Sequence, residues 1–193
     1  GLLADVVQKV VTEKSVDLVV IGSHKSNGLL RLLSGSHTYS LLHKIDCPAL
    51  LVPECFQFKG IKVIAYATDL TFNNKKVIQY LVDIVKPFKA IIAVNHISPV
   101  EFPETELEQI KGSPQLGIHH PSVFYHTIKN DNVKEGLLEV LDAGRVDILA
   151  LVHKRYSSFE RLFHASISKQ MADDAQGALL ILPYSFSIEE GII

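Results

Sequence analysis

The sequence predicts an α/β fold, an open sheet of parallel strands with helices packed against it. Short apolar runs, of the kind found in strands buried on both faces, recur at residues 17–21, 48–52, 62–67, 90–97, 123–128, 146–151 and 178–182. Segments expected to form helices alternate with these runs, at residues 2–11, 36–43, 72–88, 104–110, 133–141 and 159–175. Apolar residues at three- and four-residue spacing, typical of an amphipathic helix that packs on a sheet, form a stripe in 2–11 and one face of 72–88, which consists of Val77, Ile78, Leu81, Val82 and Val85. Strands that alternate with helices favour a parallel sheet with right-handed connections.

Length and composition narrow the class of protein. The 193 residues suffice for one large or two small domains with a real hydrophobic core. No apolar run approaches the length of about 18 residues that spans a membrane. The formal net charge of −2 gives no electrostatic reason to bind nucleic acid. Cys47 and Cys55, the two cysteines, form no Cys-x-x-Cys pair, which favours a reducing cytoplasm. We therefore expect a cytoplasmic protein with neither a membrane nor a nucleic acid as partner.

A repeat with a fixed offset of 130 residues organises the chain. Adding 130 to any number from 1 to 53 gives its counterpart from 131 to 183 without a gap. Helix, turn, strand, long loop, helix and strand recur in the same order, so that Asp17 corresponds to Asp147 and Leu50 to Leu180. Identical residues are few, and the repeat rests on order and spacing. Because an internal repeat marks a recurring structural unit, its spacing constrains the fold and the domain boundaries.

The offset predicts the domain organisation. Residues 61–183 form a complete domain, residues 1–53 form the carboxyl-terminal part of an earlier one, 54–60 link the two, and 184–193 form a tail. Because residues 1–53 have no counterpart of 54–130, we expect an amino-terminal part to be missing before them. A half-sheet exposes a hydrophobic strand edge, so we expect a partner to cover it.

The loop after the strand at 17–21 is the first candidate for a ligand site, because open α/β sheets hold ligands where strands end. Its notable residues are Gly22, Ser23, His24, Lys25, Gly28, Gly35 and Ser36. Glycines let the backbone approach a ligand closely, and the amides at a helix start favour an anion. Ser36 is also placed to cap the next helix. A Gly-Ser loop is equally a common way to build a turn in such folds, so both interpretations stay open.

This loop resembles the nucleotide loop of universal stress proteins, the UspA-like family. That loop runs Gly, two residues, Gly, nine residues, Gly-Ser/Thr. Here Gly22 and Gly35-Ser36 match, whereas Lys25 stands in place of the second glycine. Residues 47–53, Cys-Pro-Ala-Leu-Leu-Val-Pro, resemble the family's last strand. The resemblance identifies a tandem-domain member whose amino-terminal part is missing.

The resemblance covers nearly all of residues 1–183 and implies the details of the fold and of its partners. It implies an open, parallel, five-stranded sheet in the order 3-2-1-4-5 with helices on both faces, Rossmann-like and similar to the adenine-nucleotide alpha hydrolases. It implies ATP as a cofactor of the first domain only. It further implies pairing of two domains, or of two chains in a homodimer, through the last strands, residues 50–52 and 180–182.

The second loop is a degraded copy of the first. The residues that replace Gly22, Lys25, Gly28 and Gly35 are Val152, Arg155, Ser158 and Ala165. We therefore expect the second domain not to bind ATP in the family's manner. Asp69 matches the acidic residue that faces the base and ribose in the family, and we expect it to cap the following helix instead. Because Asp69 has no counterpart in residues 1–53, the first copy is expected to carry the loop without the whole pocket.

The predicted function is that of a non-catalytic stress-response or regulatory protein. Two alternatives are a slow nucleotide-dependent enzyme, an ATPase or nucleotidyl transferase, and a dimerisation module without a ligand. Such an enzyme needs metal-holding carboxylates or a catalytic lysine, and the loop offers Lys25 but no Asp or Glu before Asp46. The nine histidines, His119 and His120 among them, lack the spacing of zinc ligands, so no metal site and no catalytic residue is predicted.

Overall fold

The structure, a computed structural model, describes residues 2–22, 36–54, 56–70, 74–101, 103–112, 118, 120–142, 146–153 and 177–187. Contacts divide the chain into two compact units, each described below by itself. The first consists of Gly1–Gln57 and Leu151–Ser185, and the second of Phe58–Ala150 and Phe186–Ile193.

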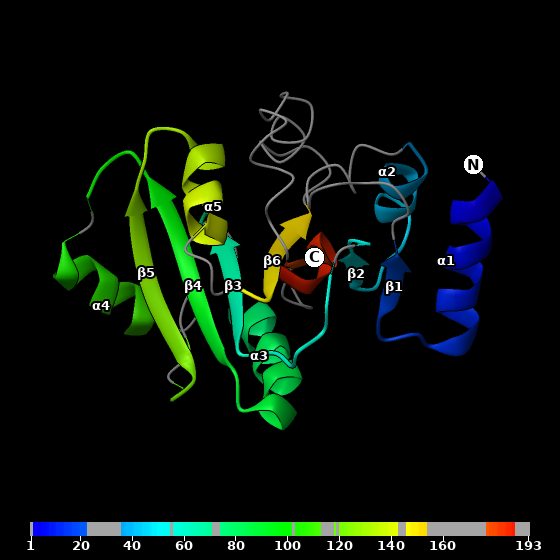
Figure 1. Cartoon of the computed structure of the whole chain (residues 1–193), viewed down its shortest axis with the longest axis horizontal. Coiled ribbons are helices and arrows are strands. Elements are labelled where there is room, and N and C mark those ends of the chain that lie inside the picture. The colour runs from blue at the N-terminus through cyan, green and yellow to red at the C-terminus, as the bar shows by residue number, and fades with distance from the viewer. Residues whose placement is uncertain are drawn as a thin grey trace, which may run out of the picture. The chain divides into compact units, whose positions relative to one another are not determined.

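The first unit holds the amino-terminal elements and the last strand. These are α1 (Leu2–Lys14), β1 (Val19–Gly22), α2 (Ser36–Leu42), β2 (Ala49–Val52) and β7 (Ala178–Pro183) (Figure 1). β1 runs parallel to β2, with Val20 opposite Leu50. β2 runs antiparallel to β7, with Leu50 opposite Leu180. The core lies along β2 and β7, where Leu51, Leu179 and Leu182 are completely buried.

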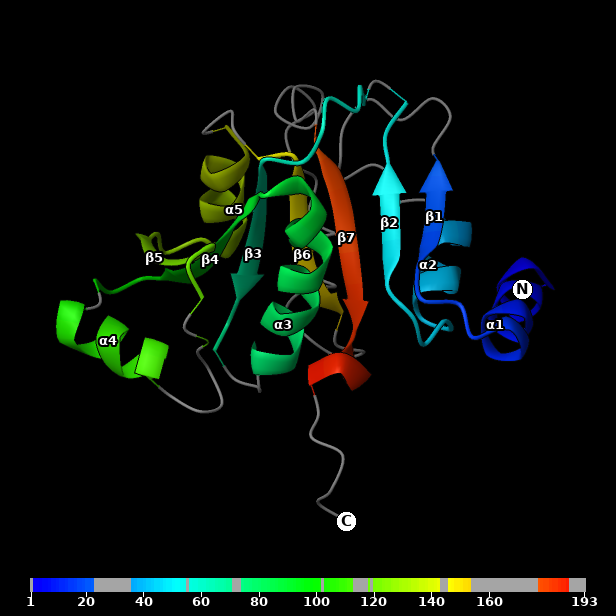
Figure 2. The same ribbon diagram turned by 90° about the horizontal axis from the view of Figure 1, so that it is seen from below.

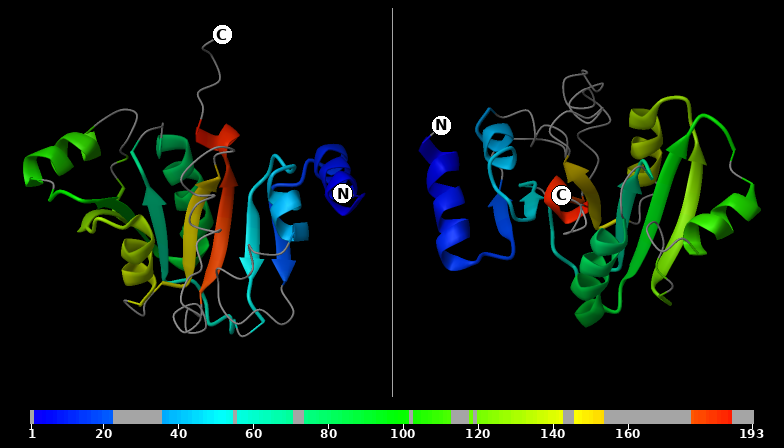
Figure 3. Two further views of the ribbon diagram at one scale, coloured as in Figure 1. Left: turned by 90° about the horizontal axis from the view of Figure 1, so that it is seen from above. Right: turned by 180° about the vertical axis from the view of Figure 1, so that it is seen from behind.

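The second unit holds the central strands and the helices that connect them. Its elements are β3 (Val63–Thr68), α3 (Asn74–Val85), the 3-10 helix η2 (Lys86–Phe88), β4 (Ile91–Ser98), α4 (Glu104–Gly112), β5 (Val123–Lys129) and α5 (Val133–Asp142). β3, β4 and β5 are parallel neighbours. α3 and α5 lie on opposite faces of these strands (Figures 2 and 3). β6 (Ile148–His153) begins in the second unit and ends in the first.

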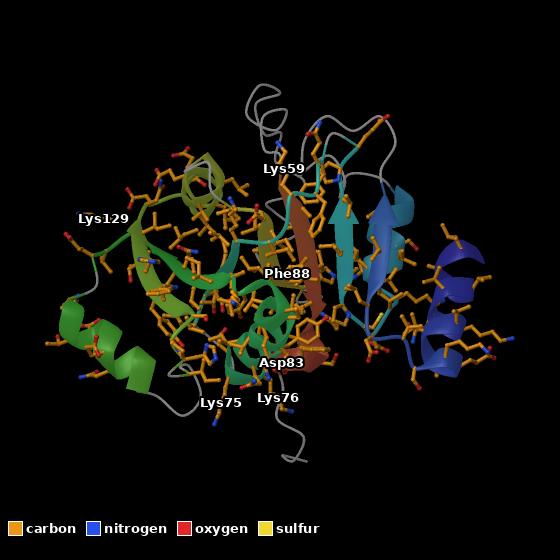
Figure 4. All side chains as sticks on the ribbon, turned by 60° about the horizontal axis from the view of Figure 1, so that its bottom comes forward. Lys59, Lys75, Lys76, Asp83, Phe88 and Lys129 are labelled. Carbon is orange, nitrogen blue, oxygen red and sulfur yellow. The ribbon has the colours of Figure 1, made fainter. Side chains whose placement is uncertain are left out.

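Helix α3 shows how the sequence pattern sets the packing in the second unit. Its buried residues are Asn74, Val77, Ile78, Leu81, Val82 and Val85, which include the whole predicted apolar face. Its outer side carries exposed charged residues, among them Lys75, Lys76 and Asp83 (Figure 4). An apolar stripe at helical spacing opposite a charged face is what anchors a helix on a sheet. The predicted helix at 72–88 is thus confirmed, with its last turn in the tighter 3-10 form.

The predicted fold class is confirmed. The strand order is β1-β2-β7-β6 in the first unit and β6-β3-β4-β5 in the second, so the five strands from β5 to β7 follow the predicted order 3-2-1-4-5. The antiparallel β2–β7 pair makes the sheet mixed, because the last strands of the two repeats lie side by side. The helix predicted at 159–175 lies outside the described residues.

The apolar stripe predicted to pack α1 on a sheet is wrong in part. Leu3, Val6 and Val10 are 56%, 54% and 47% exposed, whereas Ala4 and Val11 are buried. Exposed polar contacts accompany this orientation: Gln8 Oε1 accepts a hydrogen bond from the amide of Asp46 at 3.3 Å, and Lys44 forms an ion pair with Asp5. Three residues of the predicted stripe are thus turned to solvent.

The predicted tail begins as ordered structure. Tyr184–Ser187 form the 3-10 helix η3 directly after β7. The ring of Phe186 packs edge-on against Tyr80 of α3, with ring centroids 5.0 Å apart and an interplanar angle of 76°. Aromatic pairs at this separation and angle stabilise a contact beyond the area that they bury. The start of the predicted tail is thus held to the second unit through its Phe186 side chain.

Candidate functional site

The structure places both ends of the predicted nucleotide loop. β1 ends at Gly22, which lies opposite Val52 of β2, and α2 begins at Ser36, as predicted. Gly22 is exposed, and no atom of a described residue lies within 4 Å of a Cβ added there. Packing against the described residues therefore does not require glycine at this position.

The inner part of the loop is not described. Ser23, His24, Lys25, Gly28 and Gly35 lie outside the described residues, and for Ser36 the structure gives the backbone of the helix start. The roles predicted for these six residues remain predictions. The helix that follows ends at Leu42, close to the predicted end at His43.

The second copy of the loop starts differently. β6 continues through Val152 to His153, so Val152 lies inside a strand where its counterpart Gly22 ends one. Val152 is 6% exposed and belongs to the core. Val152 therefore lies within β6 and its side chain is part of the core, whereas Gly22 has no side chain to pack there. Arg155, Ser158 and Ala165 lie outside the described residues.

His153 at the end of β6 contacts His43 after α2. The two rings meet edge to face, with centroids 4.5 Å apart, and Nε2 of His153 lies 3.4 Å from Nδ1 of His43. His153 is buried and His43 is half-buried. Sequence reasoning did not predict this contact, because the two histidines are far apart in the chain and are not counterparts under the 130-residue offset.

A buried polar network lies where β3 ends in the second unit. The Tyr66 hydroxyl donates a hydrogen bond to Oδ1 of Asn74 at 2.5 Å, and the Thr68 hydroxyl donates to the same oxygen at 2.8 Å. The Thr68 carbonyl contacts Nδ1 of His96 at 3.0 Å, which links the network to β4. Burial raises the pKa of the Tyr66 phenol.

This network occupies the end of the sheet where open α/β folds hold their ligands. Asn74 is completely buried and the Tyr66 ring likewise, so both side chains act within the protein. Asp69 follows β3 with an exposed side chain, and α3 begins at Asn74. Polar residues at the ends of two strands, Thr68-Asp69 and His96, were a visible signal for the site. Tyr66 and Asn74 gave none, because one lies within an apolar strand and the other at a helix start.

Apart from the His43–His153 pair, the histidines and cysteines of the described part form no metal-binding cluster. His126 is exposed on β5, and Nδ1 of His120 accepts a hydrogen bond from the amide of Ser122 at 3.2 Å. No group of three or more His, Cys, Asp or Glu side chains that could hold a metal ion occurs among the residues described. Cys47 is buried, and this burial raises the pKa of its thiol. Within the described ranges, every helix is too short or too polar to cross a membrane.

The fold defines a class of protein. An open α/β sheet in which five strands follow the order 3-2-1-4-5 is a Rossmann-like architecture. The model of the universal stress protein family matches residues 1–53. The resemblance predicted from the sequence is therefore confirmed over the stretch that contains the loop.

Solved structures support the same fold. A universal stress protein from Archaeoglobus fulgidus DSM 4304 is similar with a TM-score of 0.59 and 13% identity, over 93% of this chain and 64% of that one. A functionally unknown protein from Pseudomonas aeruginosa PAO1 is similar with a TM-score of 0.57 and 13% identity, over 93% of this chain and 67% of that one. The chain thus spans about two thirds of the length of these proteins. A search of curated proteins found no significant match.

Proposed function

We propose that this chain is a non-catalytic stress-response or regulatory protein of the universal stress protein type that binds ATP at the loop between Gly22 and Ser36. One observation carries the proposal: the family match covers this loop, and the loop leaves a parallel strand at an exposed glycine that no described residue crowds. The ends of parallel strands are where open sheets bind ligands.

The residue types of the loop fit the phosphates of a nucleotide. Gly28 and Gly35 allow close backbone approach, the amides before and after Ser36 are donors for phosphate oxygens, and Lys25 brings a positive charge. The base and ribose would need the counterpart of Asp69, which residues 1–53 do not contain. Phosphate contacts alone give weak binding, so we expect a dissociation constant in the millimolar range. The second loop has lost the glycines and is not part of the proposed site.

A second candidate function is that of a pairing module without a ligand. The observation that favours it is the antiparallel pairing of β2 with β7, centred on Leu50 and Leu180. The apolar last strands of the two repeats already hold each other within this chain. A homodimer that uses the same segments is part of this candidate.

Thermal unfolding with ATP and Mg²⁺ tests the nucleotide proposal. A ligand that binds the folded state raises the apparent stability, so ATP at about ten times the expected dissociation constant should raise the melting temperature by a few degrees. Gly35→Val should abolish the rise, because a β-branched side chain blocks the close backbone approach. An unchanged melting temperature of the wild-type chain would contradict ATP binding and favour the pairing module.

A matched control comes from the repeat itself. Ala165 is the counterpart of Gly35, and Ala165→Val makes the same kind of change in the second loop. This variant should keep the full response to ATP. If it loses the response while Gly35→Val keeps it, the nucleotide binds at the second loop and the assignment to the first loop is wrong.

A further inference from the structure

The first unit exposes apolar side chains on the consecutive elements α1 and β1. The residues Val6, Val10, Asp17, Leu18 and Val20 are together called the β1–α1 face. The four apolar side chains are 54%, 47%, 36% and 61% exposed for Val6, Val10, Leu18 and Val20, respectively. The internal repeat shows what kind of partner this face fits.

The surroundings of β1 and of its counterpart β6 differ on one side. β1 has β2 as its neighbour, and β6 has β7, the counterpart of β2. On its other edge β6 has β3, whereas no strand that the structure describes lies on the other edge of β1. The position beside β1 is therefore the counterpart of the position that β3 occupies.

The exposed residues of β1 have buried counterparts in β6. Val20 is 61% exposed and its counterpart Ala150 is completely buried. Leu18 is 36% exposed, whereas Ile148 is 6% exposed. The two strands thus have the same place in the repeat but different cover. β6 is covered on one edge by β3, and no described strand covers the corresponding edge of β1.

Helix α1 differs from its counterpart α5 in the same way. Val10 is 47% exposed, whereas Val140 is 8% exposed. Val6 corresponds to Gly136, whose backbone lies so close to β4 that an added Cβ would be 2.8 Å from the Ile97 side chain. Leu3 and its counterpart Val133 are exposed in both copies, at 56% and 47%. The difference is therefore confined to the side of the helix that, in α5, faces β4.

A carboxylate marks where a strand beside β1 would begin. Oδ2 of Asp147 accepts hydrogen bonds from the first amides of the β3 segment, Lys62 N at 2.6 Å and Val63 N at 2.9 Å. Asp17 is the counterpart of Asp147, and its side chain is exposed at the start of β1. A carboxylate in this position is an acceptor for the first two amides of a strand that enters beside β1.

We propose that the β1–α1 face binds a strand–helix–strand polypeptide segment of the kind that Val63–Ser98 forms. Its first strand runs parallel to β1 with its first two amides on Asp17, and its second strand packs against Val6 and Val10. A second copy of this chain is the weaker candidate, because its β3 is already hydrogen-bonded between β4 and β6. Its edge strands, β1 and β5, each offer a single strand, whereas the counterparts of the face, β6 and α5, lie against two strands, β3 and β4.

The test joins a second copy of residues 61–130 in front of Gly1. Residue 131 is the counterpart of residue 1, so this junction reproduces the natural step from residue 130 to residue 131. In the extended polypeptide, Val10→Lys should lower the urea midpoint by roughly 1 M, because it places a charge in a covered apolar contact. In the unextended chain the same change should leave the midpoint almost unchanged.

The repeat provides a positive and a negative control. Val140→Lys should lower the urea midpoint strongly in both polypeptides, and Leu3→Lys should lower it in neither. Hydrogen exchange should show the Val20 amide protected in the extended polypeptide only. Equal effects of Val10→Lys in both polypeptides would overturn the proposal. So would a dimer of the unextended chain that Val10→Lys dissociates, because a second copy would then be the occupant.

Discussion

Leu50 in β2 lies opposite Leu180 in β7, and each is the other's counterpart under the 130-residue offset. The flanking pairs, Ala49 with Ile181 and Leu51 with Leu179, are arranged symmetrically about this central pair. A local twofold relation therefore passes between the two leucines. The pairing of β2 with β7 has the symmetry expected of the predicted repeat.

The different burial of these two leucines predicts that the same substitution lowers the free energy of unfolding by different amounts. Leu180 is 2% exposed, whereas Leu50 is half-buried. Leu180→Ala should lower the free energy of unfolding by about 2–5 kcal/mol, because it removes buried methyl groups and leaves a cavity. Leu50→Ala should cost less. Urea unfolding followed by circular dichroism measures both, and an equal or larger loss for Leu50→Ala would contradict the burial seen here.

The network of Tyr66 and Asn74 predicts which of two substitutions destabilises the protein more. Tyr66→Phe removes one of two hydroxyl donors to Oδ1 of Asn74 and should cost about 1–2 kcal/mol. Asn74→Ala should cost more, because it leaves both the Tyr66 and Thr68 hydroxyls without this buried acceptor. The comparison uses the urea midpoints of the three proteins. A milder effect for Asn74→Ala would show that the amide oxygen is not the centre of the network.

Tyr66 also predicts a loss of stability at alkaline pH. Burial raises the pKa of its phenol in the folded protein above the ordinary value of about 10. Above about pH 10 the unfolded chain therefore holds fewer protons than the folded one, and the free energy of unfolding falls as pH rises. Below that pH this contribution is fully present. Tyr66→Phe should show a shallower decline between about pH 10 and 11, and an identical decline would assign the effect to other groups.

The second unit was largely predictable from the sequence because its strands are continuous apolar runs between turn residues. β3 and β4 each lie one residue further along the chain than the predicted runs at 62–67 and 90–97. Such runs have one stable environment, the interior of a covered sheet, so local sequence determines their structure. The parallel alternation then restricts the topology.

Two features depend on tertiary contacts and were not predictable. The periodicity of α1 showed an apolar stripe but not which of its residues would be buried. The hydrogen bond from Tyr66 to Asn74 joins a strand interior to a helix start, and no local pattern contains both. The candidate loop is a different case. Its motif is visible in the sequence, and the structure describes its two ends.

The buried thiol of Cys47 predicts low reactivity. Burial raises its pKa, so the nucleophilic thiolate is scarcer than for an exposed cysteine. In a Cys55→Ser variant, Cys47 is the remaining cysteine, and a disulfide reagent at pH 8 should modify it slowly in the folded protein. Denaturant should make the reaction fast. Rapid modification of the folded variant would show that Cys47 is accessible, and the Cys47→Ser protein gives the matching rate for Cys55.

Gly136 and Gly112 predict opposite outcomes for one substitution. An added Cβ at Gly136 would lie 2.8 Å from Cγ2 of Ile97, a buried side chain of β4 that has little room to move. Gly136→Ala should therefore destabilise the protein by about 1–3 kcal/mol, despite the better helix propensity of alanine. Gly112, the last residue of α4, has no atom within 4 Å of an added Cβ, and Gly112→Ala should be neutral or slightly stabilising. Urea unfolding of both variants measures the difference. A neutral Gly136→Ala would mean that α5 and β4 are not in close contact, and the comparison of Val6 with Gly136 would then lose its basis.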